Sequence, residues 1–164
     1  MPERTGWLRE VGLRFLLWLL LGGWIGAWVT FGALVAPTAF RALPSSELAG
    51  QVVGPVISAL HGYGVAAGLL LALLALSLRR GALLVAMPLA AGLACAWSEL
   101  VITPRIAAIR PLMGGPEHAP ELTASFTQLH RLSMLIYLAV GVGTLVMLAA
   151  HVLADARRRE GELP

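Results

Sequence analysis

The chain has 164 residues, of which 58% are hydrophobic and 13% are charged, and its formal net charge is +3. Soluble domains carry about 25% charged residues, so this composition excludes a water-soluble globule, a disordered chain and a nucleic-acid-binding domain. It predicts an integral membrane protein whose main partner is the lipid bilayer.

Four segments are apolar over a length that crosses a bilayer, which requires about 20 residues. They are expected near residues 15–35, 57–78, 82–103 and 132–153. The first is longer than the apolar part of a signal peptide, roughly 7–15 residues, so we expect an uncleaved helix. Such spans must be helical, because lipid offers the backbone no hydrogen-bonding partners. The predicted fold class is therefore all-α, an integral membrane four-helix bundle.

The arginines give this bundle a predicted orientation. Eight of the twelve lie on the side of the two termini and of the short 79–81 turn, and four lie on the other side. By the positive-inside rule, the termini and this turn are expected in the cytoplasm, with the protein in the cell (inner or plasma) membrane. The predicted organisation is a cytoplasmic N-terminal segment at 1–14, a four-span transmembrane domain at 15–153 and a cytoplasmic tail at 154–164.

Helix signals occur in the outward loop expected near residues 36–56. The sequence Pro-Ser-Ser-Glu at 44–47 predicts a serine N-cap followed by an acidic first turn. The Gly54–Pro55 pair then predicts a break, because proline is tolerated best in the first turn of a helix. We therefore expect a short interfacial helix near 46–53 and a second helix that starts at the proline.

Later in the chain, Pro88 is expected to bend the third span and Pro104 to end or kink it. Residues 111–120 are rich in proline and glycine, which predicts a loop. His151 and Asp155 lie four residues apart at the end of the fourth span, and we expect them to form a surface pair. The polar tail beyond Asp155 is expected to fray.

Small residues recur within the spans, and in lipid they permit close packing of helices. They are Gly22, Gly26, Gly64, Gly68, Ala90, Ala91, Ala94, Gly141 and Gly143. These positions are also candidates for a homo-oligomer interface. The single cysteine, Cys95, is expected to be a small buried packing residue.

The first and third spans end in similar sequences, which suggests an internal duplication. Residues 36–44 and 103–111 each contain a proline, an arginine and a second proline in that order. The returning spans then open with a Leu-His pair, at 60–61 and at 129–130. A duplication would give two parallel helical hairpins related by an axis along the membrane normal. It would also place the two histidines at similar depth.

Ionisable groups gather near the outer face of the predicted bundle. At about 1.5 Å per residue, they fall into one layer to which all four helices contribute: Arg41, His61, Glu99, Arg105 and His130. Ionisable groups inside a membrane are expensive, so they usually face the bundle interior and pair with one another. We expect Glu99 to pair with Arg105 or with a histidine.

Three interpretations of this polar layer remain open. In the first, its residues serve only structure, by capping helix ends, contacting lipid and satisfying Glu99. In the second, which is our leading functional hypothesis, they bind or pass a small ligand or a lipid headgroup. In the third, His61 and His130 ligate haem or a metal ion in a membrane redox component. The sequence has no HExxH, CxxC or glycine-rich phosphate motif, and we expect a non-enzymatic protein.

Short groups of residues scattered from about residue 22 to 140 form a recognisable pattern. They are Trp28–Phe31 with Phe40–Pro44, then Pro104–Arg105 with Ala107–Ala108, and then Phe126, His130 and Ser133. In this order and spacing the chain resembles the transmembrane-protein-205-like family, a four-helix membrane domain of unknown function. The resemblance implies an integral four-helix membrane protein and no specific reaction.

Overall fold

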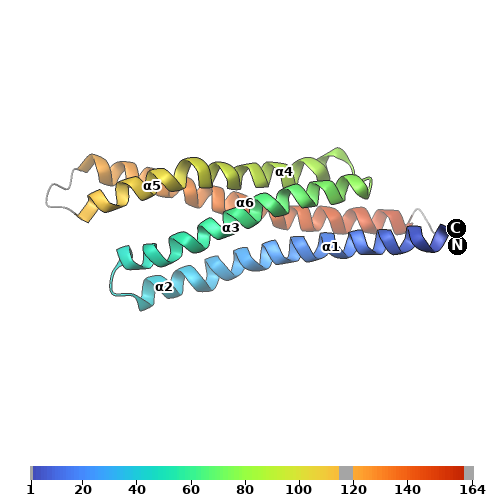
Figure 1. The fold of residues 1–164 in the computed structure, drawn as a ribbon, viewed down its shortest axis with the longest axis horizontal. Helices are drawn as coiled ribbons and strands as arrows, with labels where there is room; N and C mark the ends of the chain where they lie inside the picture. Colours follow the sequence, from blue (N-terminus) through green and yellow to red (C-terminus); the bar gives the residue numbers. More distant parts are fainter. Residues whose placement is uncertain (1, 115–119, 161–164) are drawn as a thin grey trace.

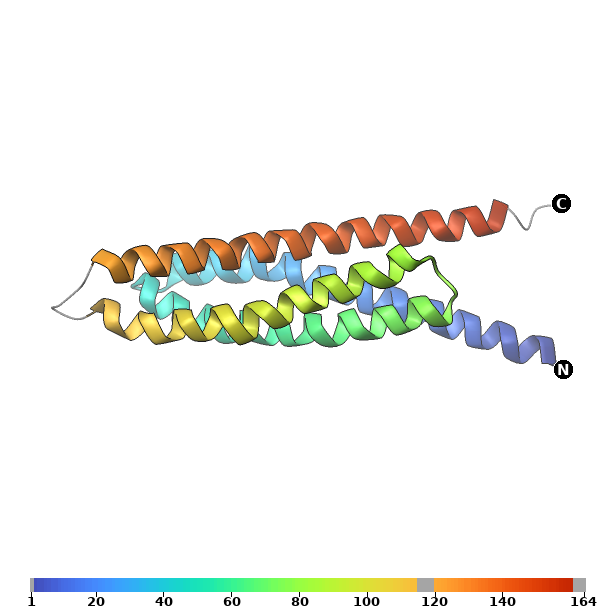
Figure 2. The ribbon, with the colours of Figure 1, turned by 90° about the horizontal axis from the view of Figure 1, so that it is seen from above.

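The structure, a computed structural model, describes residues 2–114 and 120–160. Within these residues the chain is helical and contains no strand, and four long helical segments run side by side along one axis (Figures 1 and 2). Each segment is long and apolar enough to span a membrane. The predicted all-α membrane bundle is therefore confirmed. The first segment begins and the fourth ends at the same end of the bundle (Figure 1), which we name the proximal end.

Two of the four segments contain a π-helical turn. The first consists of α1 (Pro2–Thr30), the π turn η1 (Phe31–Val35) and α2 (Ala36–Ala42), and the second is α3 (Ser46–Ser77). The third consists of α4 (Ala82–Trp97), the π turn η2 (Ser98–Ile102), α5 (Thr103–Ile109) and the 3₁₀ turn η3 (Arg110–Gly114). The fourth is α6 (Pro120–Glu160).

The two π turns stand immediately before prolines. Pro37 and Pro104 each occupy the second position of the helix that follows a π turn. A proline has no N–H to donate, and its ring clashes with the carbonyl four residues earlier. In a π turn the bond reaches one residue further, as it does between the Ala36 N–H and the Phe31 carbonyl. The wide turn accommodates the proline, so the helix continues past Pro104 rather than ending there.

The predicted break at Gly54–Pro55 is wrong, because α3 runs through both residues without interruption. The start of α3 agrees with the predicted cap, since the Ser45 hydroxyl accepts a backbone N–H at 3.2 Å. The proline deprives one carbonyl of the preceding turn of its helical donor. In that same turn, Arg110 donates to the Gly50 carbonyl at 3.0 Å. A tertiary contact thus supports the helix where the local sequence predicts an interruption.

The predicted loop at 111–120 is partly helical. Residues 110–114 form the turn η3, and α6 already begins at Pro120. Residues 115–119 lie outside the described part of the chain.

The predicted fraying beyond Asp155 is wrong as far as Glu160, where α6 ends. The cause is a contact with the turn between α3 and α4. The Arg158 guanidinium donates to the carbonyls of Leu78 at 2.7 Å and Arg79 at 3.3 Å. This contact ties the end of α6 to the rest of the bundle.

The most extensive contact in the bundle joins α3 to α4. A Cβ placed on Gly68 would lie 2.5 Å from the Pro88 carbonyl oxygen, and one placed on Gly64 would lie 2.7 Å from Cys95 Sγ. Only small residues permit backbones to approach so closely. Cys95 is fully buried at this contact, which confirms its predicted role as a packing residue.

Many large apolar side chains point away from the bundle. Leu93 and Leu100 are 70% and 76% exposed, while the core is a narrow line that includes Leu21, Trp24 and Leu71. Apolar exposure of this extent is unfavourable in water and suits a bilayer. The lipid bilayer is therefore the natural environment of this fold.

Candidate functional site

Four polar side chains form a central cluster between α3 and the third segment. They are Ser58 and His61 on α3, Glu99 in η2 and Thr103 at the start of α5. Ser58 donates to Oε1 of Glu99, and Thr103 Oγ1 donates to Oε2 at 3.4 Å. His61 Nδ1 lies 3.4 Å from the same Oε2. The predicted pairing of Glu99 with a histidine is therefore confirmed.

The central cluster lies deeper along its helices than the sequence indicates. The expected depth of His61 assumed a span that starts near residue 57. Since α3 starts at Ser46, His61 instead lies about midway along it. The missing break at Pro55 is thus the physical reason for the difference.

Burial differs sharply between the two ionisable members of the central cluster. The His61 side chain is 1% exposed, whereas the Glu99 side chain is 28% exposed. Nε2 of His61 and Oγ of the neighbouring buried Ser98 have no hydrogen-bond partner among the described residues. Buried polar atoms are normally paired. The central cluster therefore has, at Nε2 of His61, buried hydrogen-bonding capacity that no described residue uses.

Two aromatic rings close the side of the central cluster that faces α1 and α6. The Trp28 ring lies 6.3 Å from the His61 ring and stacks on Tyr137 at 4.1 Å, measured between centroids. Trp28 Nε1 donates to the Tyr137 carbonyl at 3.0 Å, and the Tyr137 hydroxyl donates to the Trp28 carbonyl at 2.5 Å. A Cβ on Gly141 would lie 2.6 Å from Trp28 Nε1. These reciprocal bonds hold both rings in place around His61.

The other three predicted site residues lie apart from the central cluster. Arg41 is exposed, and its Nε donates to the Pro37 carbonyl of its own helix at 3.2 Å. Arg105 is exposed, and no hydrogen bond or ion pair joins it to another described residue. His130 is exposed and stacks on Phe126 at 5.9 Å. Of the five predicted residues, the structure brings together only His61 and Glu99.

His61 and His130 do not share one depth. Tyr137 marks the level of His61 on α6, because its ring stacks on Trp28, the neighbour of His61. His130 precedes Tyr137 by seven residues, which places it about 10 Å nearer the distal end, away from the termini. Among the described residues, no group of three or more His, Cys, Asp or Glu side chains is arranged to hold a metal ion.

Arg105 lines a groove between α5 and α6. The groove has a volume of about 520 Å³. Its lining combines Arg105 with the polar Ser125 and Gln128 and with apolar residues such as Ile109 and Leu129. A cation beside apolar surface suits an amphipathic molecule with an anionic or polar head.

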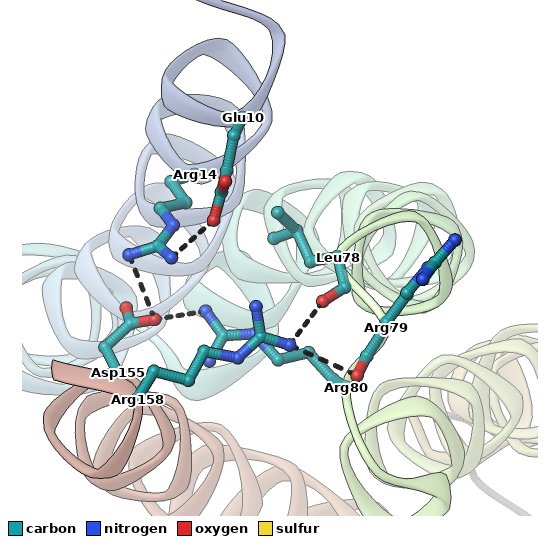
Figure 3. A network of polar contacts seen from close by, with 7 residues as sticks. All are labelled: Glu10, Arg14, Leu78, Arg79, Arg80, Asp155 and Arg158. Carbon is teal, nitrogen blue, oxygen red and sulfur yellow. Dashed lines mark hydrogen bonds and ion pairs between the residues drawn. The ribbon is translucent and has the colours of Figure 1, made fainter. Parts of the chain in front are cut away.

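A second polar network lies at the proximal end, where α1, the α3–α4 turn and α6 meet (Figure 3). Asp155 pairs with the buried Arg80 and with Arg14, whose Nη1 lies 3.6 Å away. The predicted surface pair of His151 and Asp155 is therefore wrong. His151 is 1% exposed and packs edge-on against Trp18, with ring centroids 6.4 Å apart.

The sequence pattern did not reveal this proximal network. In the sequence, Arg79 and Arg80 look like two equivalent charges beside an apolar span. The backbone distinguishes them, because Arg79 has a positive φ of 52°. Figure 3 shows the Arg79 side chain directed away from the network and that of Arg80 directed toward Asp155. One signal was available: Arg14 and Asp155 both border apolar runs at the same predicted face.

Comparison with known proteins gives one match. A family model described as Domain of unknown function (DUF4149) matches residues 19–114, which is more than half of the chain. The matched stretch contains His61, Glu99 and Arg105. No curated protein and no solved structure matches the chain.

Proposed function

The chain belongs to the family of the Domain of unknown function (DUF4149), and from this premise we propose that it binds or passes a small ligand or a lipid headgroup within the bundle. It is an integral membrane protein whose family carries no assigned activity. One observation carries the proposal. His61 is buried in a membrane-spanning helix, with one ring nitrogen beside Glu99 and the other without a partner in the part of the chain that the structure describes. Ionisable residues at such positions usually mark a substrate or ion pathway.

The two ionisable residues have different roles in this proposal. Glu99 is the contact group, because its carboxylate is partly exposed and accepts hydrogen bonds. It suits a cationic or hydrogen-donating group of the ligand. His61 lies behind it and positions the carboxylate. Arg105, in its groove on α5, suits the anionic part of a headgroup, while Arg41 and His130 are peripheral contacts near the same end.

Haem or metal ligation by His61 and His130 is the alternative that the sequence left open. It requires both imidazoles to approach one ion. The two side chains lie on levels about 10 Å apart, and His130 is engaged with Phe126. No observation therefore favours this alternative over ligand binding.

The proposal is tested by adding single lipids to the purified protein in a neutral detergent. We expect at least one of phosphatidylethanolamine, phosphatidylglycerol and phosphatidylcholine to raise the melting temperature. The variants Glu99→Gln and Arg105→Gln should each lose part of this rise, because the first removes the charge of the central cluster and the second the charge of the groove. Arg131→Gln is the matched control, since Arg131 is exposed and lines neither site. If both variants respond as the unmodified protein does, the polar layer is only structural.

Within the family, we propose the finer relationship to transmembrane-protein-205-like proteins. Two of the three groups of residues behind that resemblance fall inside the matched stretch, namely those around Trp28–Pro44 and Pro104–Ala108. The third, around Phe126–Ser133, follows it in the chain. The relationship supplies no reaction.

We also propose that the proximal end is cytoplasmic and that the protein resides in the cell membrane. The uneven distribution of arginine supports this orientation. With Cys95 replaced by alanine, a cysteine at Gly81 should resist a membrane-impermeant maleimide in intact cells, and one at Pro44 should react. Both positions are exposed turns. The reverse labelling pattern would refute the orientation.

Self-association is a further proposal about partners. Gly64 and Gly68 are already used within the bundle, whereas Gly22 and Gly26 have open space around their Cβ positions. The latter pair, four residues apart on α1, is therefore the candidate homo-oligomer surface.

A further inference from the structure

Among the described side chains at the proximal end of the bundle, arginines outnumber carboxylates. The side chains of Arg14, Arg80 and Arg158 lie there together (Figure 3). The acidic partners of this network are Glu10, which is 2.5 Å from Arg14, and Asp155. Within the described part of this network, three guanidinium groups thus stand against two carboxylates.

Several of the guanidinium nitrogens in this network are unused. The Arg80 side chain is 2% exposed. Its Nε and Nη1, together with Nε of Arg14, have no hydrogen-bond partner among the described residues. A buried cation that lacks full compensation is unfavourable. An ion, a ligand or ordered water ordinarily satisfies buried donors of this kind.

A pocket opens beside the network, and arginines from three different elements line it. Its volume is about 240 Å³. Arg9 comes from α1, Arg79 from the α3–α4 turn and Arg158 from α6, and Ser77 adds a hydroxyl group. Glu10 also lines the pocket, but its carboxylate is engaged by Arg14. The pocket therefore presents mainly donors and positive charge.

We propose that this proximal pocket binds a phosphate-bearing anion. Guanidinium groups bind phosphate by paired hydrogen bonds, and basic pockets between membrane helices bind anionic lipid headgroups. The phosphate group would contact the lining arginines Arg9, Arg79 and Arg158. Arg14 and Arg80 do not line the pocket, so the anion offsets their positive charge from beside the network rather than by direct contact. Two sources carry this chemistry, the headgroup of an anionic lipid and free inorganic phosphate. The proposal concerns the opposite end of the bundle from the Arg105 groove and does not depend on a function for the central cluster.

The test compares three probes on the full-length protein in a neutral detergent: phosphatidylglycerol, phosphatidylcholine and inorganic phosphate, the last against chloride at equal ionic strength. We expect phosphatidylglycerol or inorganic phosphate to raise the melting temperature by about 4 °C or more. A response to phosphatidylglycerol alone assigns a lipid headgroup. A response to inorganic phosphate assigns the free anion. No response to either probe overturns the proposal.

Variants locate the response within the molecule. Arg79→Gln should lose at least half of the rise, because it removes a lining charge that makes no side-chain hydrogen bond of its own within the described chain. Arg158→Gln should lose more, although it also removes bonds to the turn. Arg157→Gln is the matched control, being an exposed neighbour at the same end that does not line the pocket. Equal losses in Arg157→Gln and Arg79→Gln would mean a general surface effect and would overturn the assignment.

Discussion

At the scale of single residues, the ionisable members of the central cluster could be predicted from the sequence, but the other residues that surround them could not. Glu99 interrupts an apolar run, so an intramembrane partner could be predicted, and a histidine fills that role. Ser58 and Thr103 were not predicted as partners, because hydroxyl residues are common in membrane helices and carry no distinguishing pattern. The buried ring of Trp28, equally, cannot be distinguished in the sequence from a lipid-facing tryptophan.

Glycine positions also differ in ways that only the packing reveals. Gly62 and Gly68 lie on the same helix, but a Cβ at Gly62 meets nothing within 4 Å, while one at Gly68 meets the Pro88 carbonyl. We predict that Gly68→Ala lowers the free energy of unfolding by about 1–3 kcal/mol through overpacking. Gly62→Ala should be neutral or stabilising by up to about 1 kcal/mol, because alanine favours the helix. Titration with a denaturing detergent, followed by tryptophan fluorescence, measures both, and equal effects would argue against the close contact of α3 with α4.

At the scale of elements, the four spans follow from hydropathy alone, whereas their ends and irregularities do not. The break predicted at Pro55 does not occur, and in the turn before the proline Arg110, sixty residues after Gly50 in the chain, donates to the Gly50 carbonyl. Local sequence rules contain no information about such a partner. Conversely, Pro37 and Pro104 are each preceded by a π turn. Their repetition in the first and third segments agrees with the duplication that the sequence suggests.

The π turn in the third segment offers an element-scale prediction. A π turn contains one residue more than the α-helix needs, so deletion of the exposed Leu100 in η2 should leave both flanking faces in register, although Pro104 then clashes with the carbonyl four residues earlier. Deletion of the equally exposed Leu93 in α4 should instead rotate every later side chain by about 100°. We expect the first variant to remain folded with a lower melting temperature and the second to lose the folded state, as judged by size-exclusion chromatography and thermal unfolding. If both variants fail to fold, η2 does not tolerate the loss of one residue better than α4 does, and the prediction is wrong.

At the scale of the whole molecule, the proximal network joins α1, the α3–α4 turn and α6 through Asp155 (Figure 3). Composition could predict arginines at this end but not which of them turns inward. That choice depends on the left-handed backbone at Arg79, a feature of the turn rather than of the residue type. The predicted surface pair of His151 and Asp155 is wrong because His151 is buried against Trp18, a contact that the sequence does not show.

The network yields a prediction for global stability. Asp155→Asn leaves the buried Arg80 without a counter-charge, and we expect it to cost about 3 kcal/mol of unfolding free energy. The double variant Arg80→Met with Asp155→Leu should recover most of that loss, because it removes both charges and fills similar volume. A double-mutant cycle in detergent gives the coupling between them. Additive effects would show that the two side chains do not act as a pair.

The 79–81 turn joins two hairpins, and each hairpin returns to the end of the bundle at which it started (Figure 2). A polypeptide severed at Gly81 would therefore become two fragments, each with an even number of crossings and so able to insert without the other. Their reunion would rely on lateral diffusion and on the glycine-lined seam between α3 and α4. The covalent link therefore keeps the two hairpins close together, while the shape of each hairpin already specifies where the other one docks.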